Sequence, residues 1–371
     1  MTYETSRRFA IVPFWTLCGR VRRGWRRTYA EHMLACSRKE KDWDAEMEWL
    51  RRTAEKRRSP VPRAWRLAAL KLDYALFKGF CGADFRQDFA DQLLNPFLYY
   101  ARLVTNGRTR FVRQMLNGPE AFALCGDKAR SAEHWKDWYR RRWRLLSKDA
   151  PLDVRELEFL LDGKQTLVVK PAAGYGGAGI EFVDVSRFSG PEDCVRHLNG
   201  RKGRWFLEEF IEQTGPLHDM NPSSVNTVRV ITVRRRDGAV EPLNAYLRVG
   251  RNGAGVDNLS SGGRHYVVDL ETGRFGAGSD GNGNCLMRPA GPGDKGELPR
   301  IPQWEEVLEF CRSAHRHAPE GLGYVGWDVC VSEDGLRLVE ANATPGHGQP
   351  FSPWENPWRK MKKRLDRELD G

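Results

Sequence analysis

A glycine-rich stretch between two strand-like segments is the feature that most constrains the fold. It reads TLVVKPAAGYGGAGIEFVDV and runs from Thr166 to Val185. Its glycines fit the spacing of a dinucleotide-binding loop, but such a loop must leave a strand and open a helix. Here the segment from Ile180 onward is rich in apolar and β-branched residues, which predicts a second strand. The stretch therefore predicts a hairpin with a glycine loop at its tip, and it argues against a dinucleotide site.

Such a hairpin can hold phosphate groups without a helix. Successive backbone N–H groups in a loop form a concave site for anions, and Lys170, at the end of the first strand, can reach the same phosphates. This pattern favours ATP as the ligand. The alternative is a glycine-rich surface hairpin that binds nothing.

A second hairpin is predicted near the end of the chain. The stretch YVGWDVCVSEDGLRLVEANATPG, Tyr324 to Gly346, reads as two strands joined by a turn. With a three-residue turn, Ser332 pairs with Leu336, and counting outward places Asp328 directly opposite Glu340.

The facing carboxylates of this hairpin predict a metal site. Asn342 shares a face with Glu340, because side chains alternate along a strand. Two carboxylates opposite each other repel unless a cation lies between them. Asp328, Glu340 and Asn342 offer only oxygen ligands, which suit Mg²⁺. The alternative is that one carboxylate is salt-bridged and the register is shifted by one residue.

Two shorter patterns suggest how a nucleotide could be held. The stretch FLEEFIEQ begins at Phe206, and its segment from Glu208 to Ile211 can serve as a hinge whose backbone pairs with an adenine edge. Arg229 lies in the apolar, β-branched stretch SVNTVRVITV. A guanidinium there is costly to bury unless an anion meets it.

Length and cysteine spacing limit the class of protein. The 371 residues, 40% of them apolar, can bury a core and divide into two or three lobes. The eight cysteines are scattered without a CxxC pair, which argues against a zinc cage and favours reduced thiols in the cytoplasm. The sequence predicts neither a cleavable signal nor a membrane-spanning helix.

The positive charge is concentrated at the N-terminus. Residues 1–80 hold 19 Lys or Arg against 9 Asp or Glu, which is +10 of the net +11. Three explanations stay open: a solvated helical face, docking of residues 1–58 on an anionic membrane or a partner, and a nucleic-acid surface. Nucleic acid is the least favoured, because no known binding module accompanies the charge. Docking would place a cytoplasmic protein at the inner face of the membrane.

The periodicity of apolar residues divides the chain into three parts. Helical spacing dominates residues 1–120 and continues through 129–146, whereas short β-rich runs dominate after Pro151. Residues 273–302 read as a loop, before a helix that starts at Trp304 and a basic tail helix at 358–369. The expected domains are a basic, mostly helical region at 1–120, a first lobe at 121–213 and a second lobe at 214–371.

The order of these motifs resembles the ATP-grasp superfamily, most closely its sugar-transfer-associated branch. The resemblance runs from LCGDKARSAEHW, which begins at Leu124, to LVEANATPG, which ends at Gly346. It implies an α+β fold in which two lobes grip ATP, with the N-terminal helical lobe added.

The resemblance also implies site residues. The lysine of the DK pair, Lys128, and the strand lysine Lys170 would bind the nucleotide, and Lys170 would act in catalysis together with Arg229. The remaining nucleotide-binding residues implied are Gly174, Gly176, Gly177, Gly179, Glu208, Glu209 and Ile211. The implied Mg²⁺ ligands are Asp328, Glu340 and Asn342. The segment DNLSSGGRHYVVDLETG implies substrate contacts at Asn258, Ser260, Ser261, Gly262 and Arg264.

The activity implied is that of an ATP- and Mg²⁺-dependent ligase. Such enzymes activate a carboxylate as an acyl phosphate, which an amine, a hydroxyl or a thiol then opens, so that small-molecule or peptide carboxylates and amines are the expected substrates. Two alternatives remain. One is a kinase of the same fold that phosphorylates a hydroxyl, and the other is a noncatalytic docking protein with a vestigial ATP site.

Overall fold

The computed structural model describes residues 112–174, 179–235, 237–258, 261–280, 285–287 and 298–346. Most of the expected helical region at 1–120 and the expected tail helix at 358–369 lie outside the described residues. The three explanations for the N-terminal charge, including membrane docking through 1–58, therefore stay predictions.

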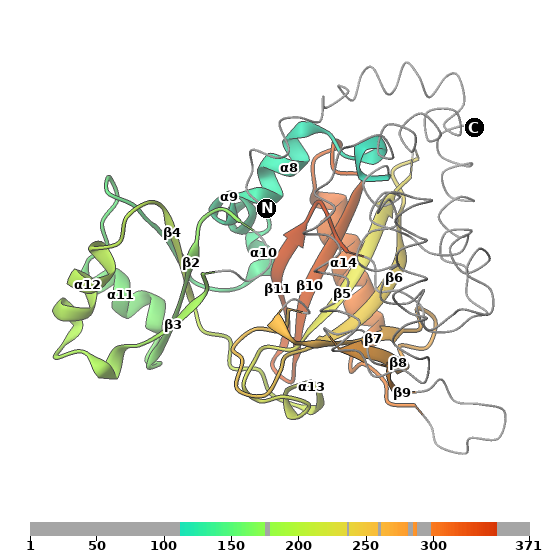
Figure 1. The fold of residues 1–371 in the computed structure, drawn as a ribbon. Helices are drawn as coiled ribbons and strands as arrows, with labels where there is room; N and C mark the ends of the chain where they lie inside the picture. The colour runs from blue at the N-terminus through green and yellow to red at the C-terminus, as the bar shows by residue number, and fades with distance from the viewer. Residues whose placement is uncertain are drawn as a thin grey trace, which may run out of the picture.

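Two antiparallel sheets form the described part of the chain (Figure 1). The smaller sheet has four strands in the order β1-β4-β2-β3. Its strands are β1 (Trp143–Leu146), β2 (Thr166–Pro171), β3 (Glu181–Asp184) and β4 (Trp205–Glu209). β2 and β3 are the two strands expected on either side of the glycine loop, and they pair as an antiparallel hairpin.

Helices α11 (Val154–Leu161) and α12 (Pro191–Asn199) cover one face of the small sheet. α11 begins with a capping box, in which Asp153 accepts a hydrogen bond from the N–H of Glu156 and the Glu156 side chain accepts one from the N–H of Asp153. α12 has a proline in its first turn, where the missing N–H costs nothing. Neither helix is among the expected elements, although the capping box of α11 and the N-terminal proline of α12 can both be recognised in the sequence.

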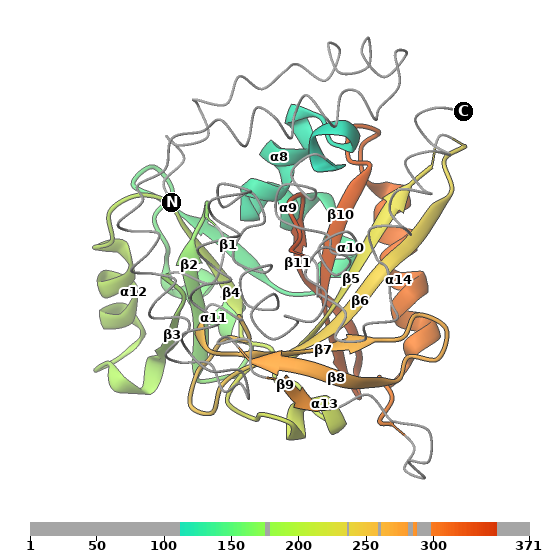
Figure 2. The same cartoon turned by 45° about the vertical axis from the view of Figure 1, so that its right-hand side comes forward.

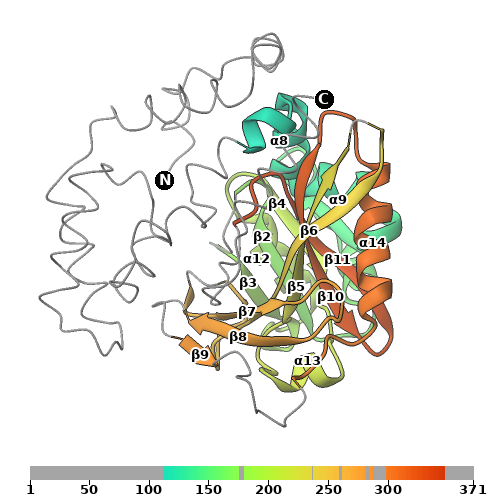
Figure 3. The same ribbon diagram turned by 90° about the vertical axis from the view of Figure 1, so that its right-hand side faces the viewer.

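The larger sheet has seven strands in the order β11-β10-β5-β6-β7-β8-β9. Their bounds are β5 (Thr227–Arg234), β6 (Val240–Val249), β7 (Arg264–Val268), β8 (Phe275–Asp280), β9 (Cys285–Met287), β10 (Tyr324–Ser332) and β11 (Gly335–Asn342). Helix α14 (Trp304–His317) runs along one face, as Figure 3 shows. The main apolar core lies between α14 and this face, and it includes the buried rings of Trp304 and Trp327.

Three short helices, α8 (Pro119–Gly126), α9 (Lys128–His134) and α10 (Lys136–Tyr139), lie beside β10 and β11 (Figure 2). α8 contributes to the core of the large sheet, whereas Ala129 and Tyr139 pack against Phe206 of the small sheet. The remaining short elements are η2 (Val185–Arg187) and α13 (Pro216–Asp219).

Two expectations about local structure are wrong. The helical pattern expected through 146 ends at Tyr139, because Arg140 adopts the left-handed conformation with φ 52° and the chain then continues as β1, which pairs with β4. The loop expected at 273–302 contains β8 and β9. In both places pairing with a neighbouring strand decides the structure, and such pairing has no signal in the local sequence.

The α+β class expected from the sequence is confirmed. In the described part of the chain, no helix is long and apolar enough to cross a membrane.

Candidate active site

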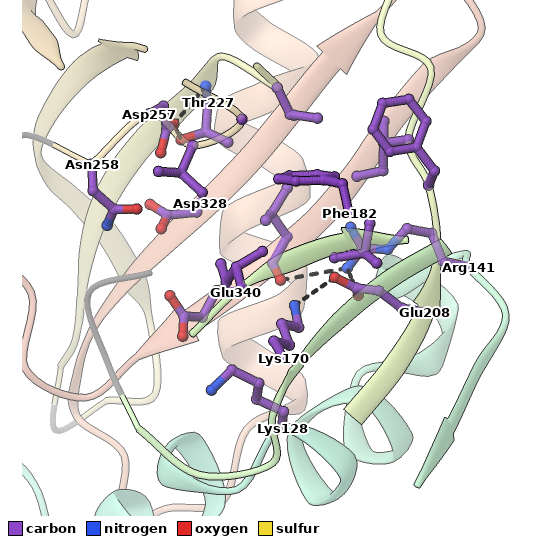
Figure 4. A pocket seen from close by; sticks show the side chains of 18 of the residues that line it. Lys128, Arg141, Lys170, Phe182, Glu208, Thr227, Asp257, Asn258, Asp328 and Glu340 are labelled. Carbon is purple, nitrogen blue, oxygen red and sulfur yellow. Dashed lines mark hydrogen bonds and ion pairs between the residues drawn. The ribbon is translucent and has the colours of Figure 1, made fainter. Parts of the chain in front are cut away.

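A cleft lies between the two sheets (Figure 4). It holds about 900 Å³ of empty space, part of it open solvent. Its charged and polar lining residues are Lys128, Arg141, Lys170, Glu208, Glu209, Thr227, Arg248, Asp257, Asn258, Asp328 and Glu340. The fold thus gathers, in one place, ionisable groups that lie far apart in the sequence.

Strand alternation turns Lys170 and Glu208 toward the cleft. Leu167 and Val169 of β2, with Leu207 of β4, point into the core under α11 and α12. Lys170 follows Val169 and Glu208 follows Leu207, so both side chains point to the opposite face of the sheet. Lys170 Nζ lies 2.5 Å from Glu208 Oε1, and both side chains are almost fully buried.

Glu208 is held by two cations and a phenol. Its Oε2 lies 3.1 Å from Arg141 Nη2, and the hydroxyl of Tyr139 also donates to Oε2. Burial alone would raise the pKa of Glu208, but the charges of Arg141 and Lys170 outweigh it and hold the pKa below its usual value. The carboxylate is therefore ionised at neutral pH, and its side chain is the counter-ion of Lys170.

The rest of the expected adenine hinge forms a wall of the cleft. The Glu209 side chain accepts a hydrogen bond from Lys164 Nζ at 2.7 Å, and Lys164 also donates to the Phe210 carbonyl at 3.1 Å. Within the described residues, the backbone of Ile211 forms no hydrogen bond. Phe182 of β3 meets Phe210 edge to face, with ring centroids 6.0 Å apart. This end of the cleft is apolar, with a backbone edge beside it.

Lys128 enters the cleft from the first turn of α9. Asp127 caps that helix by accepting from two backbone N–H groups, and Lys128 Nζ donates to the Gly174 carbonyl at 3.0 Å. Burial lowers the pKa of Lys128 in spite of the nearby Glu340 carboxylate. Gly174 and Gly179 both have positive φ, 122° and 75°. Of the other loop glycines expected to bind nucleotide, Gly176 and Gly177 lie outside the described residues.

Asp328 and Glu340 lie directly opposite each other in the β10–β11 ladder, as expected. The expected turn is nevertheless wrong, because Ser332 pairs with Gly335 and the turn has two residues. A β-bulge at Val339 inserts one residue into β11 and restores the pairing of the two carboxylates. A shorter turn and a bulge thus offset each other.

Asp328 is shared between two arginines. Arg229, its partner across the β5–β10 ladder, donates through Nε and Nη2, and Arg248 Nη1 lies 2.6 Å from Oδ2. Burial would raise the pKa of Asp328, but the two guanidinium groups outweigh it and lower the pKa. Both parts of the alternative left open above are therefore found: one carboxylate is salt-bridged, and the register is shifted by one residue between the turn and the bulge. The bulge at Val339 nevertheless restores the expected pairing of Asp328 with Glu340.

Arg248 and Asp257 are site residues that the sequence analysis did not single out. Arg248 Nη2 lies 2.7 Å from Asp257 Oδ1, and Asp257 also accepts from the N–H of Thr227 at 3.1 Å. Arg248 interrupts the apolar stretch NAYLRVG in the way that Arg229 interrupts its own strand. The same argument about the cost of burying a guanidinium could have found it.

The hairpin residues fit a hard cation only in part. Asn342 Nδ2 lies 3.5 Å from Asp328 Oδ2 and 3.4 Å from Glu340 Oε2, so the three side chains converge. Glu340 forms no ion pair within the described part of the chain, whereas both oxygens of Asp328 bond to arginines. Among the described residues no group of three or more His, Cys, Asp or Glu could hold a metal. Glu340 and Asn342 are therefore the better placed oxygen ligands, and Asp328 could join them only by releasing an arginine.

The expected acceptor segment reaches the cleft through Asn258, which lies beside Asp257 in the lining. Ser261 N–H donates to the Asn258 carbonyl at 3.0 Å, and Gly262 has φ 86°. Arg264 donates to the Met220 carbonyl at 3.4 Å and is not among the residues that line the cleft. Ser260 lies outside the described residues.

Comparison with known structures finds ligases and synthetases at low identity. The D-alanine–D-alanine ligase from Coxiella burnetii is 11% identical with a TM-score of 0.42, and the match covers 71% of this chain and 65% of that chain. The same enzyme from Bacillus anthracis is 14% identical over 68% of this chain and 70% of that chain, with a TM-score of 0.41. N5-carboxyaminoimidazole ribonucleotide synthetase from Thermotoga maritima is 15% identical over 62% and 45%, with a TM-score of 0.36. Such low values say nothing about the substrate of this chain.

A search of curated protein sequences finds no match. The model of one protein family, described as sugar-transfer associated ATP-grasp, matches residues 146–350, which is more than half of the chain. The matched segment contains β2, the β10–β11 hairpin and most of the cleft lining. The chain therefore belongs to the sugar-transfer-associated ATP-grasp family.

Proposed function

We propose that this protein is an ATP- and Mg²⁺-dependent ligase that joins a carboxylate to an amine, or to a hydroxyl or thiol, through an acyl phosphate. One observation carries the proposal. A single cleft is lined by Lys128 and Lys170 and by the carboxylates Asp328 and Glu340, and Arg229 pairs with Asp328. Membership of the family supports ATP as the substrate that this cleft binds.

The proposed nucleotide position follows the character of the cleft walls. The adenine would lie at the apolar end against Phe182 and Phe210, with its polar edge at the Ile211 backbone. Lys128 and Lys170 would neutralise the α- and β-phosphates. Gly174, at the start of the glycine loop, would lie beside these phosphates, because its carbonyl accepts a hydrogen bond from Lys128.

Glu340 and Asn342 would hold Mg²⁺, with Asp328 as a third ligand once it releases an arginine. When bound, Mg²⁺ supplies positive charge that shields the β- and γ-phosphates from an incoming anion. The residues of the chain do the rest of the positioning. Arg229 and Arg248, fixed by Asp328 and Asp257, present guanidinium groups that can stabilise charge on the transferred phosphoryl group.

The proposed reaction has two displacements. A carboxylate oxygen of the first substrate attacks the γ-phosphorus, the bond from that phosphorus to the bridging oxygen of ADP breaks, and ADP leaves with the bonding electrons. The amine of the second substrate then attacks the acyl carbon, phosphate leaves, and the amine gives up a proton to solvent. Asn258 would lie on the acceptor side of the cleft, and the family description, sugar-transfer associated, favours an acceptor in saccharide biosynthesis.

Trapping with hydroxylamine tests this proposal. The protein is incubated with ATP, Mg²⁺ and pools of carboxylic acids, and ADP and hydroxamate are measured. A ligase gives hydroxamate together with ADP, because hydroxylamine opens the acyl phosphate. A kinase of the same fold gives ADP and a phosphorylated hydroxyl compound without hydroxamate. Failure of the protein to bind ADP or ATP at all would contradict both functions and favour a docking protein.

A further inference from the structure

Arg141 is a buried arginine that none of the expected roles uses. It follows α10 and precedes β1, and its side chain is 2% exposed. The carbon of its guanidinium group lies 3.9 Å from the centre of the Tyr139 ring, a distance at which the ring face attracts a cation. Burial and the ring together fix the plane of the guanidinium group.

The same guanidinium nitrogen touches both sheets. Arg141 Nη2 lies 3.1 Å from Glu208 Oε2 on β4 of the small sheet and 3.4 Å from the carbonyl oxygen of Val339 on β11 of the large sheet. The second contact is long, but its acceptor is informative. Val339 is the bulged residue of β11, the one without a partner in the β10–β11 register.

The two contacts connect the phosphate side of the cleft to its metal side. Glu208 holds Lys170 through its other oxygen at 2.5 Å. Val339 immediately precedes Glu340, and the bulge at Val339 is what places Glu340 opposite Asp328. A chain of direct contacts therefore runs from Lys170 through Glu208 and Arg141 to the backbone beside Glu340.

We infer that Arg141 is a positioning residue that couples Lys170 on the small sheet to Glu340 on the large sheet, so that nucleotide and metal bind as one unit. The inference rests on the proposed function. Arg141 shares the negative charge of Glu208, which leaves Lys170 freer to turn toward a phosphate. It also anchors the bulge, which fixes the direction of Glu340. Among the described residues, loss of Arg141 leaves Glu208 with Lys170 as its one cation, and the Val339 carbonyl beside Glu340 loses a contact.

The metal dependence of nucleotide binding tests the inference without any turnover. ADP binding is measured by calorimetry with saturating Mg²⁺ and again with a chelator, and the ratio of the two affinities measures the coupling. Arg141→Met is expected to lower this ratio about tenfold or more, the effect typical of outer partners of a metal ligand. Arg144→Met, which removes a partly exposed ion pair with Glu156 three residues further along the chain, in β1, should leave the ratio unchanged. Mn²⁺ bound with ADP should also show an altered electron paramagnetic resonance spectrum in the Arg141 variant only.

A second variant distinguishes a loss of positioning from a loss of the fold. Arg141→Lys keeps a positive charge beside Glu208 but is too short to keep both contacts, so it should fold and still show the lowered ratio. An unchanged ratio in a folded Arg141 variant overturns the inference while the proposed function stands. Unfolding of both variants would assign Arg141 a purely structural role and overturn it as well. A wild-type protein that binds no ADP fails the proposed function itself.

Discussion

Lys170 Nζ lies 2.5 Å from Glu208 Oε1 in the wall of the cleft, and neither side chain is more than one-tenth exposed. Glu208 carries one negative charge but faces two cations, since Arg141 lies 3.1 Å from its other oxygen. The group as a whole is therefore positive in a region of low dielectric. A triphosphate would supply the missing negative charge without any rearrangement of Glu208.

Glu208→Gln should destabilise the protein strongly. Among the described residues, the substitution leaves Lys170 and Arg141 buried without a paired carboxylate, and removal of one partner from a buried ion pair typically costs about 3 to 5 kcal/mol. Glu156→Gln, which breaks the half-exposed pair with Arg144, should cost about 1 kcal/mol or less. Urea unfolding of both variants measures the difference. Equal losses in the two variants would show that the buried network contributes no more than a surface pair.

The sequence predicts the features that depend on strand alternation. Alternation alone puts Lys170 on the cleft face, and counting residues outward from a turn puts Asp328 opposite Glu340. The partners of these groups come from elsewhere. Arg141 reaches Glu208 and Arg248 reaches Asp328 from strands or loops whose neighbours only the tertiary fold decides. Counting also succeeded at the hairpin only because the bulge at Val339 offsets the shorter turn.

Gly179→Ala should weaken both the fold and nucleotide binding. Gly179 has φ 75°, and a Cβ there would lie 3.0 Å from Pro171 Cγ. Gly163 has a similar φ of 80° with nothing within 4 Å of the added Cβ, so it is a matched control. Both alanine variants should lose about 1 to 2 kcal/mol for the left-handed backbone. Only the Gly179 variant should also bind ADP more weakly, as measured by calorimetry, because its added Cβ crowds Pro171, the neighbour of Lys170 in the chain. Weaker ADP binding in the Gly163 variant alone would contradict this assignment.

His315 should make the fold sensitive to acid. Its Nε2 lies 2.8 Å from the Leu322 carbonyl, which can only accept, so Nε2 carries the hydrogen and Nδ1 accepts from the Thr232 hydroxyl. Burial lowers the pKa of His315 from 6.5 to about 3. Between pH 6.5 and about pH 3, His315 is therefore protonated in the unfolded chain but neutral in the folded chain. Stability is therefore lost as pH falls from 6.5 toward 3, by up to about 1.4 kcal/mol per pH unit.

Unfolding free energies measured between pH 4 and 7 test this dependence. His315→Gln keeps a donor for the Leu322 carbonyl and should fall less steeply with acid than the wild type. His197→Gln changes an exposed histidine on α12 and should keep the wild-type slope. A slope in the His315 variant as steep as in the wild type would assign the acid sensitivity to other groups.

The three acidic residues of the metal side should differ in what they contribute to stability. Asp328→Asn leaves Arg229 buried without a carboxylate in the described part of the chain, so the free energy of unfolding should fall by about 3 to 5 kcal/mol. Asp257→Asn should cost only about 1 to 3 kcal/mol, because Arg248 keeps Asp328 and the amide oxygen can still accept from Thr227 N–H.

Glu340→Gln removes no ion pair among the described residues and should change stability by about 0.5 kcal/mol or less. The same Glu340 variant should nevertheless lose Mg²⁺-dependent ADP binding, which separates its role from that of Asp328. Urea unfolding ranks the three variants, and calorimetry with and without Mg²⁺ completes the comparison. If Glu340→Gln were the most destabilising of the three, Glu340 would be a structural carboxylate rather than a ligand held ready for a metal.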